Sequence, residues 1–297
     1  MNAELRQHAA RYVELLQRHG KKDAWLPAGL ARRLPVASPS SSPSTQASST
    51  GREIRPASPT LARGPVPPSP AKPKNDFDLN SILKGVQGSK ADKLSALREK
   101  TAACKICPHL AKSRTQVVFG IGNPEAKLMF VGEAPGAEED KKGEPFVGLA
   151  GKLLTKMITA MELTREQVYI ANVLKCRPDM PANTSGNRKP TRTEMDACLP
   201  YLRAQVAIIA PTVIVALGST AVEGLFGPQK TTISRLRGTW MELDGVPVRP
   251  TFHPSYLLHN QDLALKRLVW TDLLAAMEKL SLPISEKQRG YFLKPAA

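Results

Sequence analysis

Residues Lys127–Leu154 read KLMFVGEAPGAEEDKKGEPFVGLAGKLL, and this stretch decides the fold of the chain. Its apolar run LMFV is typical of a buried strand in a sheet that is covered on both faces. Apolar residues then recur at helical spacing from Leu149 to Leu163. A loop rich in glycine and carboxylates joins the strand to the helix. In open α/β sheets, ligands bind outside the carboxyl ends of the strands, so this loop is a candidate functional site.

The loop does not have the sequence of a phosphate-binding loop. It contains neither G-x-G-x-x-G nor G-x-x-x-x-G-K-[ST], the glycine-rich patterns that hold phosphates. Its first nine residues, GEAPGAEED, include four acids that would repel a phosphate. The composition therefore argues against a phosphate cradle at this position.

Strands and helices alternate through the rest of the folded region. The predicted elements are a helix from Ser89 into Cys104, a strand at Val168–Leu174, a helix at Arg192–Ile209, a strand at Thr212–Gly218, a helix at Gly218–Phe226, two strands flanking Asp244-Gly245, and a helix at Asp262–Leu280. The strands are apolar rather than alternating, which is typical of parallel strands covered on both faces. We predict an α/β fold with three layers, α/β/α, around a mainly parallel sheet.

The chain divides into four segments. Residues 1–26 contain a short amphipathic helix at Ala3–Arg18. Residues 27–86 are a basic linker rich in Pro, Ser and Ala, which cannot bury enough apolar surface to fold and is expected to be disordered. This linker acts either as a tether to a polyanion or as a passive spacer. Residues 87–285 are the folded domain, and residues 286–297 are a C-terminal tail.

The charge of the chain indicates a polyanionic partner. The 42 Lys and Arg residues exceed the 26 Asp and Glu residues, which gives a formal net charge of +16. Such a balance suits nucleic acid, although a merely soluble basic protein has the same signature. The sequence has no apolar run of about 18 residues and no signal-peptide core, so we expect a cytoplasmic protein without a membrane partner.

Four cysteines form a second constellation. Cys104 and Cys107 make a C-x2-C pair, whereas Cys176 and Cys198 are far apart in the sequence. This spacing argues against a zinc ribbon or finger, in which both pairs are locally spaced. Four thiolates from distant segments suit a [4Fe-4S] cluster, but spacing alone does not separate iron from zinc. Four unrelated buried cysteines are the remaining alternative.

The segment TFHPSYLL, Thr251–Leu258, forms a third constellation after the last strand. His253 precedes Pro254, and we expect a loop that presents an apolar tip at Tyr256 and Leu257. A lone histidine is commonly a structural hydrogen-bonding group. His253 nevertheless follows a strand end, as the acid-rich loop does, so the two segments are expected to face one crevice.

The motifs GEAPGAEED, EPFVGLAGKLL, YIANVLKCRP, GNRKP and HPSYLL occur in this order with the four cysteines. Together they resemble the family 4 uracil-DNA glycosylases, the iron-sulfur members of the uracil-DNA glycosylase superfamily, over roughly Leu94–Leu280. The resemblance implies one α/β/α domain with a central four-stranded parallel sheet and a [4Fe-4S] cluster on Cys104, Cys107, Cys176 and Cys198. It also implies a monomeric repair enzyme that hydrolyses the N-glycosidic bond of uracil in single- or double-stranded DNA and leaves an abasic site.

The same resemblance assigns roles to individual residues. The implied uracil pocket is lined by Gly132, Glu133 and Ala134, by Phe146 as the stacking aromatic, by Asn172 as the base-reading amide and by His253 near O2. We expect Glu133, Asn172 and His253 to be catalytic, with Glu133 stabilising the sugar cation and orienting water. The Glu139 region is expected to exclude the methyl group of thymine, and Tyr256 or Leu257 is expected to wedge into the vacated base stack.

Two departures from the family pattern qualify this reading. Other superfamily members carry an aspartate for the attacking water where this chain has Ala134, and the segment Asp179–Ser185 lengthens a loop. A rival hypothesis on the same scaffold is a protein that binds uracil-DNA or traps it covalently without turnover. Relatives that trap carry an inserted basic, histidine-containing loop, which AEEDKKGEPFVG does not contain. A further alternative is a non-catalytic module fused to a DNA-binding tail.

Overall fold

The computed structural model of the protein describes residues 86–178, 180 and 186–293, all within one compact unit. The predicted segment 1–26, all but the last residue of the predicted linker 27–86, and most of the loop extension Asp179–Ser185 lie outside the described residues. Within the described part of the chain, no helix is long and apolar enough to cross a membrane.

A six-stranded sheet forms the middle layer, in the order β1-β3-β2-β4-β6-β5. The strands are β1 (Ile121–Gly122), β2 (Leu128–Gly132), β3 (Tyr169–Asn172), β4 (Val213–Leu217), β5 (Met241–Leu243) and β6 (Val246–Thr251). Strands β3, β2, β4 and β6 are parallel, and Phe130 lies opposite Ile170 on one side and Val215 on the other. The predicted four-stranded parallel sheet is confirmed. The short strands β1 and β5 extend it with one antiparallel strand at each edge.

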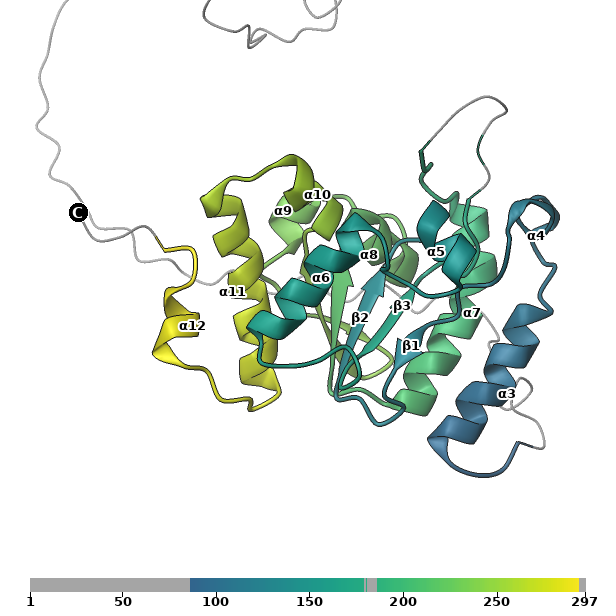
Figure 1. Ribbon diagram of the computed structural model, residues 1–297, viewed down its shortest axis with the longest axis horizontal. Helices are drawn as coiled ribbons and strands as arrows, with labels where there is room; N and C mark the ends of the chain where they lie inside the picture. Colours follow the sequence, from purple (N-terminus) through teal and green to yellow (C-terminus); the bar gives the residue numbers. More distant parts are fainter. Residues whose placement is uncertain (1–85, 179, 181–185, 294–297) are drawn as a thin grey trace, which may run out of the picture. The chain divides into compact units, whose positions relative to one another are not determined.

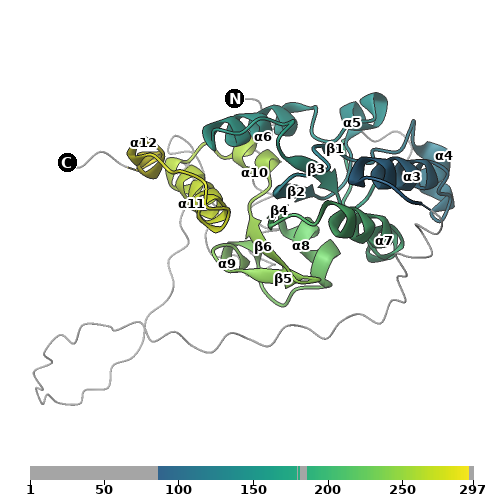
Figure 2. The same ribbon diagram turned by 90° about the horizontal axis from the view of Figure 1, so that it is seen from below.

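Helices cover both faces of this sheet. They are α3 (Lys90–Ala102), α4 (Pro108–Ser113), α5 (Ala137–Lys142), α6 (Leu149–Ala160), α7 (Arg192–Ile209), α8 (Ser219–Phe226), α9 (Ile233–Leu236), α10 (Pro254–His259), α11 (Leu263–Lys279) and α12 (Glu286–Gly290). Side chains along a strand point alternately to opposite faces. Met129 and Val131 therefore share a core with α3, α7 and α8, whereas Leu128 and Phe130 share one with α6, α10 and α11. Figure 2 shows α6 and α7 on opposite sides of the sheet, which confirms the predicted three-layer α/β/α fold.

Two segments differ from the prediction. Residues Pro254–His259 form the short helix α10 rather than a loop, because Pro254 is at its first turn and His253 caps it. The predicted tail from residue 286 begins with α12, whose Gln288 is buried. Trp270 donates its indole N–H to the Gln288 carbonyl oxygen at 2.6 Å, and Gln288 Nε2 donates to the Ala160 carbonyl oxygen at 3.0 Å. The folded domain therefore continues past residue 285.

A buried carboxylate ties β6 to α11 just before the HPSYLL segment. Asp272 is fully buried and pairs with Arg249 at 3.0 Å and with Arg237 at 2.9 Å. It also accepts hydrogen bonds from the Thr251 hydroxyl at 2.9 Å and the Gly238 backbone N–H at 3.0 Å. Because its charge is paired and its oxygens are hydrogen-bonded, the group is tolerated in the core. It fixes the end of β6 two residues before His253.

Candidate functional site

The carboxyl ends of the parallel strands meet at one edge of the sheet, near α5 and α10 (Figure 1). Gly132 ends β2, Asn172 ends β3, and the two residues lie opposite each other in the ladder. A Cβ atom on Gly132 would come within 3.0 Å of both the Asn172 side chain and the Phe146 ring. The rings of Phe146 and His253 lie 5.7 Å apart between centroids. The fold therefore brings Gly132, Phe146, Asn172 and His253 together, as predicted.

Asn172 contributes an unpaired acceptor to this site. Its residue is 2 % exposed, and the side-chain Oδ1 atom has no hydrogen-bond partner among the described residues. Leaving a buried acceptor unsatisfied costs about 1–3 kcal/mol. An N–H group of a bound ligand would remove this cost, which makes Oδ1 an acceptor suited to the edge of a base.

The Phe146 loop is held in a conformation that L-residues rarely adopt. Phe146 has φ of 55°, in the left-handed region, which costs on the order of 1–3 kcal/mol unless its surroundings enforce it. Gly151 permits this conformation, since a Cβ there would collide with the Phe146 carbonyl group. The neighbouring backbone is fixed by Glu139, which accepts hydrogen bonds from Val147 N–H at 3.0 Å and Gly148 N–H at 2.9 Å.

Glu139 is thus engaged differently from our expectation. Its second carboxylate oxygen accepts from Gly136 N–H at 3.1 Å, so both oxygens bind backbone amides at the two ends of the loop. A carboxylate satisfied by three backbone donors is fixed in place. Glu139 therefore braces the loop that carries Phe146, and its expected part in excluding thymine stays a prediction.

The tautomer of His253 follows from its partners. The Ser255 backbone N–H lies 3.1 Å from Nδ1, and the Ser255 hydroxyl lies 2.7 Å from the same atom. A backbone N–H is only a donor, so Nδ1 is the acceptor and the proton of the neutral ring is on Nε2. Burial lowers the pKa of His253 to about 4, against the opposing charge of Glu139. At neutral pH the ring is therefore a neutral Nε2–H donor.

Glu133 has its partners on the other side of the sheet edge. Successive residues along a strand point to opposite faces of the sheet. The Glu133 side chain is therefore directed to the face opposite to that of Gly132. Burial raises the pKa of the Glu133 carboxyl, whereas a hydrogen bond with Thr220 and the charge of Lys189 lower it. These partners come from α8 and the GNRKP segment rather than from the Phe146 loop. Ala134, the next residue, packs against the cysteines instead.

The four cysteines lie in one region beside this site. Cys176 and Cys198 are buried with Leu110 and Leu174, and Cys107 packs against this small cluster. Burial raises the pKa of the Cys107 and Cys176 thiols and raises that of Cys198 to about 12; in each case the other cysteines add to the effect. The thiols of the unliganded protein are therefore protonated, and a metal must displace these protons to bind.

The surroundings of the cysteines suit thiolate ligands. Arg114 donates to Cys176 Sγ at 3.1 Å, and the Lys175 backbone N–H donates to Cys198 Sγ at 3.2 Å. Across the described ranges, no three His, Cys, Asp or Glu side chains are close enough to hold one metal ion. Four cysteine sulfurs are a donor set that can hold either a single zinc ion or an iron-sulfur cluster.

The two residues predicted as a DNA wedge differ in exposure. Tyr256 is 49 % exposed, whereas Leu257 is 5 % exposed and packs into the core. The reason is the helix α10, which turns Leu257 inward and Tyr256 outward. Leu257 is therefore buried in the conformation described, and the wedge role of both residues stays a prediction.

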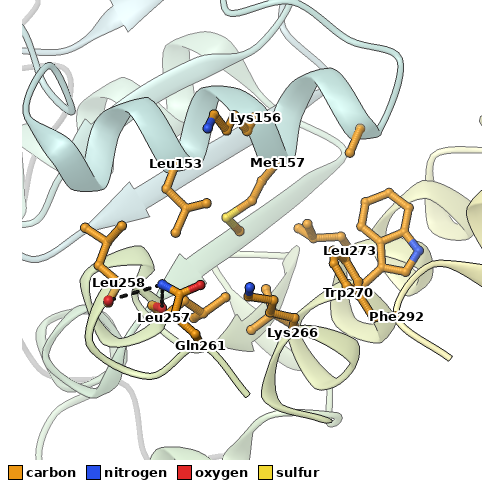
Figure 3. A pocket seen from close by; sticks show the side chains of 12 residues that line it. Leu153, Lys156, Met157, Leu257, Leu258, Gln261, Lys266, Trp270, Leu273 and Phe292 are labelled. Atoms are coloured by element: carbon orange, nitrogen blue, oxygen red, sulfur yellow. Dashed lines mark hydrogen bonds between the residues drawn. The ribbon is translucent and has the colours of Figure 1, made fainter. Parts of the chain in front are cut away.

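An apolar cavity of about 400 Å³ lies behind α10 (Figure 3). It is lined by Leu257, Leu258 and Gln261 on one side and by residues of α6 and α11 on the other, including Met157 and Trp270. Gln261 Nε2 donates to the carbonyl oxygens of Leu257 and Leu258 at 3.0 and 3.2 Å. Neither Asn172 nor His253 lines this cavity, so it is distinct from the predicted pocket.

Several contributors to the site were not found from the sequence. Ser255 sets the histidine tautomer, Gly151 leaves room for the Phe146 carbonyl, and Arg114 and Lys175 donate to cysteine sulfur atoms. Ser255 and Gly151 stand inside the motifs HPSYLL and GLAGKLL, and Lys175 precedes Cys176 directly. The sequence motifs mark these positions, but they do not reveal which atoms the residues contact.

Comparison with known proteins gives a consistent result. A family model described as "Uracil DNA glycosylase superfamily" matches residues 119–274. The type-4 uracil-DNA glycosylase of Thermotoga maritima is 47 % identical over 181 residues, which are 61 % of this chain and 91 % of the relative. That of Sulfurisphaera tokodaii is 44 % identical over 210 residues, covering 68 % and 91 %, and that of Archaeoglobus fulgidus is 44 % identical over 179 residues, covering 58 % and 86 %. The chain belongs to the type-4 family of the uracil-DNA glycosylase superfamily.

Proposed function

We propose that this protein hydrolyses the N-glycosidic bond of uracil in DNA, releases free uracil and leaves an abasic site for base excision repair. The observation that carries the proposal is the meeting of three groups at one sheet edge. These are the unpaired acceptor of Asn172, the neutral His253 and the Phe146 ring beside Gly132. The names of the type-4 relatives support the same activity.

Base recognition is proposed to combine stacking with hydrogen bonding. Uracil inside a duplex must be flipped out, at a cost of a few kcal/mol. Stacking on Phe146 returns about 1–3 kcal/mol but does not distinguish one base from another. The Asn172 side chain supplies selectivity, since Oδ1 accepts from uracil N3–H and Nδ2 donates to O4. Cytosine presents the reverse pattern at these atoms and would leave buried groups unpaired.

Departure of the base is proposed to depend on His253. As the N-glycosidic bond breaks, its electron pair moves into the uracil ring, and negative charge develops on O2. The Nε2–H of neutral His253 is the donor for that oxygen. Removing one such donor from an oxyanion site costs about 10²–10³ in rate.

Glu133 is the carboxylate proposed to act on the sugar. Its ionised form would stabilise the cation-like sugar and orient a water molecule for attack at C1′, and the proton of that water passes to solvent. Burial raises the pKa of this carboxyl overall, and the Thr220 hydrogen bond and the Lys189 charge oppose that rise in favour of the ionised form.

We propose that Cys104, Cys107, Cys176 and Cys198 hold a [4Fe-4S] cluster. When bound, it would supply a rigid cross-link between three segments and no electron, because hydrolysis is redox-neutral. The buried thiols and the N–H groups of Arg114 and Lys175 that point at sulfur support this assignment. Absorbance of anaerobically purified protein at about 400 nm tests it. A colourless, zinc-loaded and fully active preparation would reject iron.

The remaining proposals concern the contacts with DNA and the setting of the domain. Tyr256 is an exposed aromatic residue of α10 that would enter the vacated base stack. Residues 1–26 and 27–86 are proposed as an N-terminal helix and a basic tether that adds salt-sensitive phosphate contacts. The protein is proposed to act as a monomer in the cytoplasm, a reducing compartment where cysteines stay available to metals.

An alkali-cleavage assay on uracil-containing DNA tests the function. Strand scission after alkali treatment is the expected result, because alkali cleaves DNA at abasic sites. A control duplex with thymine in place of uracil must stay intact. A shifted band that survives SDS would identify a covalent trap instead, and binding without scission would identify a non-catalytic module.

A further inference from the structure

Lys175 lies between the cysteines and the strand that carries Asn172. It is 1 % exposed, and its Nζ atom donates to the Asn172 backbone oxygen at 2.9 Å and to Gln205 Oε1. Its own backbone N–H donates to Cys198 Sγ at 3.2 Å. One residue therefore contacts both a cysteine sulfur and the peptide group of the base-reading residue.

Burying the Lys175 side chain costs free energy. Taking an ammonium group out of water costs several kcal/mol unless its donors are satisfied. No carboxylate among residues 86–178, 180 and 186–293 pairs with this lysine, and its two acceptors are neutral. A stability role alone would be met better by an apolar side chain of similar volume.

Gln205 orients the lysine toward Asn172. Its Nε2 atom donates to the Phe119 carbonyl oxygen at 2.9 Å and to the Tyr169 hydroxyl at 3.1 Å. Because both donors of the amide are engaged, Oε1 is the atom that faces Lys175. The ammonium group is then held between two fixed oxygens, one of which belongs to the last residue of β3.

We propose that Lys175 is a positioning residue for base recognition, which fixes the peptide group of Asn172 and ties it to the cysteine region. The inference rests on the proposed function of Asn172. Lys175 does not touch the base, and it acts only through the placement of the Asn172 side chain. The cysteine region and the backbone of the base-reading residue are thereby linked through the hydrogen bonds of Lys175.

A double-mutant cycle tests this proposal in single-turnover excision of uracil. Lys175→Met keeps the length of the side chain and removes its donors, and Asn172→Ala removes the amide. We expect Lys175→Met to lower the rate constant about tenfold while leaving DNA affinity within about twofold, because the hydrogen bond to the Asn172 backbone oxygen is lost. Asn172→Ala with Lys175→Met should be no slower than Asn172→Ala alone. Multiplying losses would overturn the proposal.

The control is Lys90→Met. Lys90 Nζ also donates to a backbone carbonyl, that of Ile209 at 2.8 Å, but at the opposite end of the sheet, where α7 ends. We expect its rate constant to equal that of the wild type. Lys175→Arg, which retains charge and donors, should recover part of the loss.

Two further measurements separate positioning from misfolding and from iron loss. The rate constant is taken from the active fraction, so partial unfolding lowers the amplitude and not the constant. Iron per chain should be unchanged in Lys175→Met, and the side-chain amide signals of Asn172 should shift in a spectrum of ¹⁵N-Asn-labelled protein. Unshifted signals, or a rate loss proportional to iron loss, would reject the positioning role. If Lys175→Met does not fold, Gln205→Met replaces it with the same expected non-additivity.

The proposed function and the positioning role of Lys175 are tested by different measurements. If the wild-type protein releases no uracil, the function is rejected by that result alone. The Asn172 amide signals still decide whether Lys175 positions that residue.

Discussion

Gly132→Ala is the sharpest perturbation of the site. The added Cβ would lie 2.5 Å from Phe146 Cζ and 2.7 Å from its Cε2, and within 3.0 Å of Asn172 Oδ1. Phe146 has little freedom to retreat, since Glu139 and Gly151 fix its loop. Overpacking of this kind costs about 1–3 kcal/mol of stability. A displacement of reacting groups by about 1 Å lowers the rate about 10²-fold.

The assay is single-turnover excision of uracil from a saturating oligonucleotide, paired with urea unfolding. We expect a loss of about 10²-fold in rate with a decrease of about 1–3 kcal/mol in the free energy of unfolding. Gly290→Ala is the control, because a Cβ there meets nothing within 4 Å. Wild-type rate and stability in Gly132→Ala would refute the placement of Phe146 and Asn172 against Gly132.

Three other predictions follow from the described contacts. His253→Ala should lower single-turnover excision by about 10²–10³ with little effect on DNA affinity. The pKa of His253 falls to about 4 on folding from an ordinary value of 6.5, so the unfolded chain binds the proton more tightly. Wild-type stability should therefore fall by about 2–3 kcal/mol as pH drops from 6.5 to 4, and His253→Ala should lack this slope in pH-dependent unfolding. Asp272→Ala should cost about 3–5 kcal/mol in urea unfolding, because it removes the carboxylate that pairs with the buried Arg249 and the partly buried Arg237, and an unchanged midpoint would contradict the network. Cys198→Ser should lose iron and absorbance near 400 nm together, and full iron retention would exclude this residue as a ligand.

The sequence by itself determined the layers of the fold and the segments that carry the site. An apolar run such as LMFV indicates a strand that is buried on both faces. Apolar residues at helical spacing in the following segment indicate a helix with one buried side. Strands and helices alternate along the chain, which is typical of parallel strands. The carboxyl ends of parallel strands lie at one edge of the sheet. This is why the loop that begins at Gly132 and the segment that carries His253, 121 positions further along the chain, could be expected to meet, whereas Asn172 was placed with them by the family resemblance.

The tertiary structure alone decided what each side chain touches there. Glu139 binds three backbone amides, Glu133 turns toward Thr220, and Leu257 is buried by helix α10. Nothing in the sequence distinguishes Lys175 from other basic residues. In the structure it is buried, and its Nζ atom donates to the Asn172 backbone oxygen. Periodicity reports which face of an element is apolar, but not which polar atoms the folded chain places opposite it. Hydrogen bonds between residues far apart in sequence depend on atomic positions that only the packed layers fix.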